Sequence, residues 1–319
     1  MRILYHPTQS SQQRQHEKKR WIYPVLLAMQ AQWHRDRGET VYWEVATGDV
    51  DCVVTEPEHV DFLKLPAPDR MFTDAMNVKY QNNGNFKYHP GTYIQVADGC
   101  WYGKCSFCVE RKREWKVRPV SVVYEELKTI KELGFREAFD DSGSFPRGEW
   151  LDELLGMKTT ELVLGCNVRM VDYPWRQMKH WGFRMVLFGI ESCNQRTLDR
   201  IHKGTTIADI RHIADAARAG LDCHGAFMIF PWETHKETMH TISTVHRLLI
   251  NGTLKTAQCS LYDIGGVRDE SKRKYVSKLY DVAYSPRFWF NKIISIRNEA
   301  DFKYLMRQIK EGLRRADHD

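Results

Sequence analysis

A repeating alternation of strand-like and helix-like segments from residue 92 onward constrains the fold more than any other feature. β-Branched and aromatic residues mark six strands, and apolar residues at helical spacing fill the segments between them. Strands separated by helices of this length indicate a parallel sheet with right-handed crossovers. We therefore expect an α/β fold, a partial (β/α)6 barrel of the TIM type, with a doubly wound open sheet as the alternative. The predicted strands cover residues 92–99, 135–141, 161–171, 183–192, 221–230 and 254–264.

The rest of the chain divides into three shorter segments. The first contains short strands and one helix beginning near Pro24, which predicts a small α/β unit. The second is rich in Pro, Gly and polar residues, as is typical of a linker. The last is basic, and its end is predicted to be helical. We place the boundaries at 1–64 for the small unit, 65–91 for the linker, 92–265 for the barrel and 266–319 for the helical C-terminal segment.

Composition restricts the cellular setting and the class of partner. No apolar run approaches the ~20 residues that would span a membrane, and the N-terminus lacks the residue order of a secretory signal. We expect a cytoplasmic protein, in which the eight cysteines stay reduced and act as ligands, nucleophiles or core residues. The net charge of +6 is spread over runs that also contain acids, so a nucleic-acid surface is not indicated.

Three closely spaced cysteines follow the first predicted barrel strand, in the segment DGCWYGKCSFC. Cys100, Cys105 and Cys108 lie where an active site of this fold is expected, at the carboxyl end of a strand. One loop of this spacing can wrap an iron–sulfur cluster, and three thiolates on four irons leave one iron open for a small molecule. A structural zinc site usually has four ligands, and no second ligand pair follows nearby. We favour the cluster, with a zinc site and inert core cysteines as the alternatives.

The cysteine loop resembles that of the radical S-adenosylmethionine (radical SAM) superfamily, whose usual spacing is C-x3-C-x2-C with an aromatic residue before the last cysteine. Phe107 fills the aromatic position. One extra residue lies between Cys100 and Cys105, and Gly103 can absorb it.

Three later segments resemble the cofactor-binding motifs of the same superfamily, in their order and in their positions at strand ends. They are FDDSGSF (139–145), FGIES (188–192) and MIFPWET (228–234). In the last segment, Ile229 and Trp232 replace two glycines of the usual motif, which predicts a different or more closed adenine pocket.

The resemblance implies a 4Fe–4S cluster on the three cysteines, with S-adenosylmethionine bound to the open iron. One electron, from a donor such as a flavodoxin or ferredoxin, would cleave the cofactor and start radical chemistry on a substrate that the sequence does not identify. Asp and Ser also favour turns and helix caps, so purely structural roles are the alternative for some of the implied residues. The implied cofactor-binding residues are Phe107, Asp140, Asp141, Ser142, Arg169, Glu191 and Ser192.

The N-terminal unit and the approach LPAPDRMF (65–72) resemble the cobalamin-binding branch of the superfamily. A full domain of that kind has about five strands, and the Asp-x-His-x-x-Gly cobalt-ligand motif of some relatives is absent from the sequence. We expect a shortened remnant without cobalamin. A cobalamin-dependent radical SAM methyltransferase is therefore the first alternative function. A non-catalytic iron–sulfur or zinc-binding protein is the second.

Overall fold

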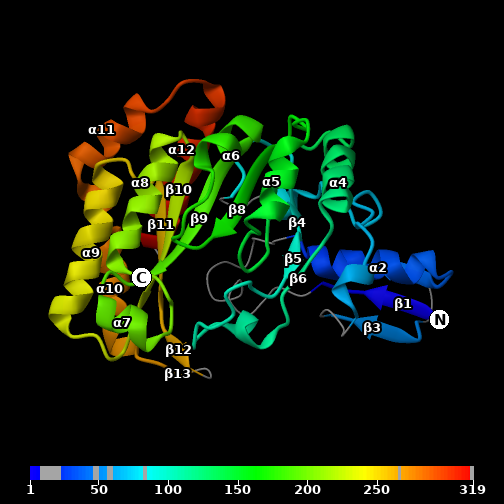
Figure 1. Cartoon of the computed structure of the whole chain (residues 1–319), viewed down its shortest axis with the longest axis horizontal. Coiled ribbons are helices and arrows are strands. Elements are labelled where there is room, and N and C mark those ends of the chain that lie inside the picture. Colours follow the sequence, from blue (N-terminus) through cyan, green and yellow to red (C-terminus); the bar gives the residue numbers. More distant parts are fainter. Residues whose placement is uncertain (8–22, 46–49, 56–59, 82–84, 265–266, 317–319) are drawn as a thin grey trace.

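A computed structural model gives the fold and describes residues 1–7, 23–45, 50–55, 60–81, 85–264 and 267–316 (Figure 1). Its main sheet contains six parallel strands in the order β11-β10-β9-β8-β7-β4. Each strand pairs with the next one in the chain, so the order never reverses, and the sheet curls into a half-barrel. The doubly wound alternative is wrong, because that fold needs a reversal of strand order. The strands are β4 (Gly91–Ile94), β7 (Glu137–Asp140), β8 (Val163–Val168), β9 (Phe183–Glu191), β10 (Asp222–Ile229) and β11 (Thr256–Leu261).

Helices connect these strands and cover the outer face of the half-barrel (Figure 1). Helix α9 begins at a capping box in which Thr234 and Glu237 satisfy each other's backbone N–H groups. The helices lie where the sequence pattern predicts them, because the apolar residues at helical spacing are the ones that face the sheet. They are α4 (Val120–Glu132), α5 (Glu149–Gly156), α6 (Trp175–Trp181), α7 (Gln195–Arg200), α8 (Arg211–Arg218) and α9 (His235–Ile250).

The first and last predicted barrel strands are each divided in the structure. After β4 the chain bends, and β5 (Ala97–Asp98) pairs antiparallel with β6 (Lys116–Val117). The cysteine loop is therefore the connection of a small hairpin rather than a direct extension of β4. After β11, β12 (Asp263–Ile264) pairs antiparallel with β13 (Val267–Arg268).

The N-terminal unit has its own small parallel sheet, in the order β2-β1-β3, and a second core around Tyr5 and Leu27. An ion pair of 3.1 Å between Lys116 Nζ and Asp61 Oδ1 joins the end of this unit to the β5–β6 hairpin. The short strands and the helix after Pro24 are present as predicted: β1 (Arg2–Tyr5), α2 (Val25–Asp36), β2 (Thr40–Trp43) and β3 (Cys52–Val54).

The C-terminal segment is helical, with α10 (Arg273–Tyr280), α11 (Pro286–Ile294) and α12 (Glu299–Ala316). Helix α12 returns to the start of the barrel, where Asp301 pairs with Lys87 and Arg307 donates to the carbonyl oxygen of Lys87 at 3.0 Å. It therefore packs at the amino end of β4 and leaves the opposite end of the sheet free for a site. In the part of the chain that the structure describes, no helix is both long enough and apolar enough to cross a membrane.

Candidate cluster site at the carboxyl ends of the strands

Cys100, Cys105 and Cys108 share one loop at the carboxyl end of the half-barrel. Cys105 is buried and the other two are half-buried. Burial raises the pKa of Cys108, and the neighbouring thiols Cys105 and Cys100 raise it further, so the three side chains are close enough to interact electrostatically. Among the described residues, no group of three His, Cys, Asp or Glu side chains surrounds a single metal position. Three thiols on one loop match the donors of an iron–sulfur cluster, whose thiolates bind separate irons, and a structural zinc ion usually takes four ligands around one centre.

The loop is held by the turn that follows α7. Tyr102 Oη donates to the carbonyl oxygen of His202 at 3.0 Å, and the backbone N–H of Ser106 donates to that of Ile201 at 2.9 Å. Phe107 packs against the buried apolar cluster around Ile201. The structure thus gives Phe107 a loop-anchoring contact, and its predicted role near the cofactor stays a prediction.

Gly204 makes this docking possible, which leads to a testable prediction. Its φ is +64°, and a Cβ added there would lie 1.9 Å from Tyr102 Oη. In Gly204→Ala we expect Tyr102 to be displaced and the iron content of the reconstituted protein to fall clearly, because the loop would lose its support. The readout is iron and sulfide per chain.

Gly252→Ala is the matched control, because Gly252 has φ +78° and no atom within 4 Å of an added Cβ. Both variants carry the backbone cost of about 1–2 kcal/mol for a left-handed alanine. Only Gly204→Ala also introduces a steric clash, with Tyr102. Equal iron content in the two variants would contradict the proposed docking.

Arg169 follows β8 and lies against the cysteine loop. Its Nη1 is 3.6 Å from Cys105 Sγ, and its guanidinium carbon is 3.6 Å from the centroid of the Tyr102 ring. The Nη2 group donates to the carbonyl oxygen of Lys203. A buried cation at this position would offset the negative charge that a bound cluster and its ligands bring to the loop. Arg169 is therefore positioned to support the cluster loop, while its predicted contact with the cofactor stays a prediction.

Glu191 at the end of β9 forms a buried ion pair with Lys203, with Oε1 and Nζ 2.8 Å apart. Glu191 has φ +66°, a left-handed conformation that is uncommon for residues other than glycine and often marks a functional site. Gly189 leaves room for the pair, since a Cβ there would lie 2.8 Å from Glu191 Oε1. The Lys203 ammonium lies 5.9 Å from the centroid of the Phe107 ring. Lys203 could not be predicted as a site residue, because nothing in the sequence places it opposite Glu191.

Asp140, the last residue of β7, and Ser142 bind the backbone that leads to the cysteine loop. Asp140 Oδ1 accepts from the N–H of Val96 at 2.9 Å and from Ser142 Oγ at 2.7 Å. Ser142 Oγ in turn accepts from the N–H of Ala97 at 2.8 Å. Burial raises the pKa of Asp140 to about 7, and its Oδ2 has no hydrogen-bond partner among the described residues. That oxygen remains available to a ligand, whereas Asp141 is exposed beside it.

Ser192 and Glu233 meet between β9 and β10, where Ser192 Oγ donates to Glu233 Oε1 at 2.6 Å. Within the described part of the chain, Glu233 Oε2 is buried and has no hydrogen-bond partner. The next residue, Thr234, is the N-cap of α9. In the same segment Ile229 is buried, and the ring centroids of Trp232 and Tyr262 are 5.0 Å apart.

The remaining barrel cysteines are buried in the hydrophobic core. Burial raises the pKa values of Cys193, Cys223 and Cys259 to about 12 and that of Cys166 well above its ordinary value. These thiols stay protonated at neutral pH, unlike metal-ligating thiolates.

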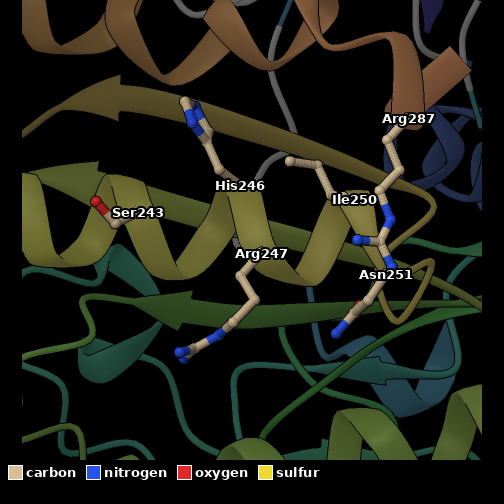
Figure 2. A pocket seen from close by; sticks show the side chains of 6 residues that line it. All are labelled: Ser243, His246, Arg247, Ile250, Asn251 and Arg287. Atoms are coloured by element: carbon tan, nitrogen blue, oxygen red, sulfur yellow. The ribbon is translucent and has the colours of Figure 1, made fainter.

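Two hollows differ in their relation to the cysteines. The larger, about 500 Å³, lies on the outer side of α9, and Figure 2 shows its lining side chains from α9, its C-terminal end and α11. None of the strand-end residues described above lines it, so it is not the candidate active site. The smaller, about 180 Å³, includes Trp101, the neighbour of Cys100.

Comparisons with known proteins relate part of this chain to one superfamily. Residues 94–245 match the model of the radical SAM superfamily. An uncharacterized methyltransferase of Pyrococcus horikoshii is 29% identical over 207 residues, which cover 61% of this chain and 43% of that protein. The chain thus spans less than half the length of this relative.

Solved structures of radical SAM enzymes are similar to part of this chain. TsrM from Kitasatospora setae, a radical S-adenosylmethionine methyltransferase, has a TM-score of 0.49 at 18% identity, over 58% of this chain and 37% of that one. OxsB, a cobalamin-dependent S-adenosylmethionine radical enzyme, has a TM-score of 0.47 at 15% identity, over 83% of this chain and 42% of that one.

Proposed function

We propose that this chain reductively cleaves S-adenosylmethionine at a 4Fe–4S cluster and starts radical chemistry on a substrate, because residues 94–245 match the model of the radical SAM superfamily. The observation that carries the proposal is the arrangement of the cysteine loop. Its three thiols cluster at the carboxyl end of the sheet, with Arg169 beside Cys105.

The residues of the chain supply binding, charge and shielding. Cys100, Cys105 and Cys108 would hold the cluster, which when bound supplies the electron that cleaves the sulfur–carbon bond of S-adenosylmethionine. The buried cations Arg169 and Lys203 would offset the negative charge that the thiolates bring to this end of the barrel.

Two buried carboxylate oxygens are available for the polar groups of S-adenosylmethionine. Asp140 Oδ2 and Glu233 Oε2 both lack a hydrogen-bond partner in the described part of the chain. Since a buried acceptor without a partner is costly, a donor such as the amino group of the cofactor would stabilise either one. We propose that these oxygens and the strand-end residues Asp141, Glu191 and Ser192 line the cofactor site.

The test is formation of 5′-deoxyadenosine by the anaerobically reconstituted protein, given S-adenosylmethionine and a strong reductant. We expect 5′-deoxyadenosine together with an equal amount of methionine. Iron and sulfide analysis must first establish that the cluster is loaded. A protein that carries the cluster but neither binds nor cleaves S-adenosylmethionine would refute the proposed enzyme activity. It would favour the alternative of a non-catalytic iron–sulfur protein. Zinc without sulfide would favour a structural zinc site.

A cobalamin-dependent methyltransferase is the second candidate, favoured by the relative named as a methyltransferase. In the described part of the chain the N-terminal sheet has three strands, whereas a doubly wound sheet of the cobalamin-binding kind has about five. Cobalamin retained through purification, together with S-adenosylhomocysteine among the products, would favour this candidate over the first.

The partners and setting follow from the chemistry. A radical SAM enzyme needs a reductant, and we propose a flavodoxin or ferredoxin as the class of donor. We also propose that the protein works in the cytoplasm, where its cysteines would stay reduced.

A further inference from the structure

The smaller hollow is an aromatic recess beside the cysteine loop. Its volume of about 180 Å³ lies below the ~300 Å³ at which pockets for whole drug-sized ligands begin. The recess therefore suits one flat ring system rather than a complete large ligand. It is lined by Trp101, Trp115, Val117, Pro146, Arg147 and Trp150.

Two of the tryptophans are fixed in place. Trp150 Nε1 donates to the carbonyl oxygen of Arg118 at 2.8 Å, and its ring meets Phe145 edge-on with centroids 5.7 Å apart. Trp101 has the guanidinium carbons of Arg147 and Arg169 each 5.5 Å from a ring centroid. Rigid indole walls bind a planar ring with little loss of conformational entropy.

Arg147 gives the recess a charge preference. Its side chain is exposed and lies over the Trp101 ring, and it makes no hydrogen bond or ion pair with any residue that the structure describes. No carboxylate on the described part of the chain neutralises it, so its five N–H donors are free for an anionic group, which they can bind in a bidentate manner.

The recess also adjoins the cluster loop. Trp101 is next to the ligand Cys100, and Arg169 contacts both the Trp101 ring and Cys105 Sγ. A ring bound against Trp101 would therefore lie at the mouth of the proposed cofactor site, where a substrate must be held.

We propose that this recess binds the ring of a planar aromatic substrate that carries a carboxylate or phosphate, with Arg147 binding the anionic group. The inference rests on the proposed function in treating the bound ring as part of the substrate. The binding itself requires neither a reductant nor S-adenosylmethionine.

The test is isothermal titration calorimetry on the reconstituted full chain, without reductant. The probes are indole-3-acetate, indoxyl phosphate, neutral indole-3-ethanol and the non-aromatic cyclohexylacetate. We expect one of the anionic indoles to bind, and to bind roughly tenfold more tightly than either control, because a charge-assisted hydrogen bond is worth one to two factors of ten. The two anionic indoles distinguish a carboxylate ligand from a phosphate ligand.

Three variants locate the binding. Arg147→Gln and Trp115→Ala should each weaken binding of the preferred indole roughly tenfold. Arg287→Gln, which removes an exposed arginine of the other hollow (Figure 2), should leave binding of the preferred indole unchanged.

Equal binding by all variants, equal binding of neutral and anionic indoles, or no binding would overturn the inference. Such a failure alongside 5′-deoxyadenosine formation would leave the proposed function intact. Binding without cofactor cleavage would instead refute the proposed function alone.

Discussion

Cys105→Ala is expected to reduce 5′-deoxyadenosine formation to the level of protein without iron. Cys105 is the most buried of the three loop cysteines and the one in contact with Arg169. Its loss leaves two thiols, too few to keep a cluster of four irons in this loop, and it leaves the Arg169 cation without its anionic neighbour. The measurements are iron and sulfide per chain, the visible absorption of the cluster, and 5′-deoxyadenosine after reduction.

Cys52→Ala is the control for the general effect of removing a thiol. Cys52 lies half-buried in β3 of the N-terminal unit, outside the cysteine loop. This variant should keep the iron content and activity of the unchanged protein. Full activity in Cys105→Ala, or equal losses in the two variants, would show that the three-cysteine loop is not the cluster site.

The half-barrel could be predicted because its determinants are local. Apolar residues at helical spacing and runs of β-branched residues recur in order, and each falls in the expected strand or helix. The exact extent of β4 could not be predicted. The chain leaves the sheet after Ile94 because Asp140 and Ser142 bind the backbone N–H groups of Val96 and Ala97. Those bonds join residues more than forty positions apart, and strand propensity carries no information about them.

The site was only partly predictable for the same reason. The spacing of the three cysteines is a local signal, and it located the loop. The partners of the other residues are remote in the sequence. Glu191 meets Lys203, and Ser192 meets Glu233, through the register of neighbouring strands and turns. The recess combines two tryptophans of the cysteine loop with Trp150 of α5, and only the fold brings the two segments together.

Glu126 was also missed, although the sequence contained a signal for it. In α4 it shares a helix face with the buried residues Val123, Leu127 and Ile130, whereas the adjacent Glu125 is exposed. A glutamate on an apolar helix face requires a partner. The structure supplies two, at 2.6 Å from Arg70 and 2.5 Å from Arg118.

Glu126→Gln is expected to lower the free energy of unfolding by about 3–5 kcal/mol, because it leaves two buried guanidinium groups without their counter-charge. All three side chains are at most 2% exposed. Arg70 and Arg118 also donate to the carbonyl oxygens of Tyr93 and Gln95, at 2.9 and 3.2 Å, so the damage should reach the strand that leads to the cysteine loop. The measurement is chemical denaturation of the reconstituted protein, followed by circular dichroism.

Glu125→Gln is the matched control, with the same substitution one position earlier in the helix. Glu125 pairs only with Lys128 on the exposed side of α4, so the midpoint of unfolding should not move. The pH dependence gives a second check. Burial alone would raise the pKa of Glu126, but Arg70 and Arg118 hold it below its ordinary value. The contribution of Glu126 should then be complete above its unfolded pKa of about 4.3 and be lost as the pH falls through the lower folded value. The difference in stability between the unchanged protein and Glu126→Gln should therefore shrink in acid. A constant difference down to the pH of acid unfolding would show that the loss comes from packing rather than from charge.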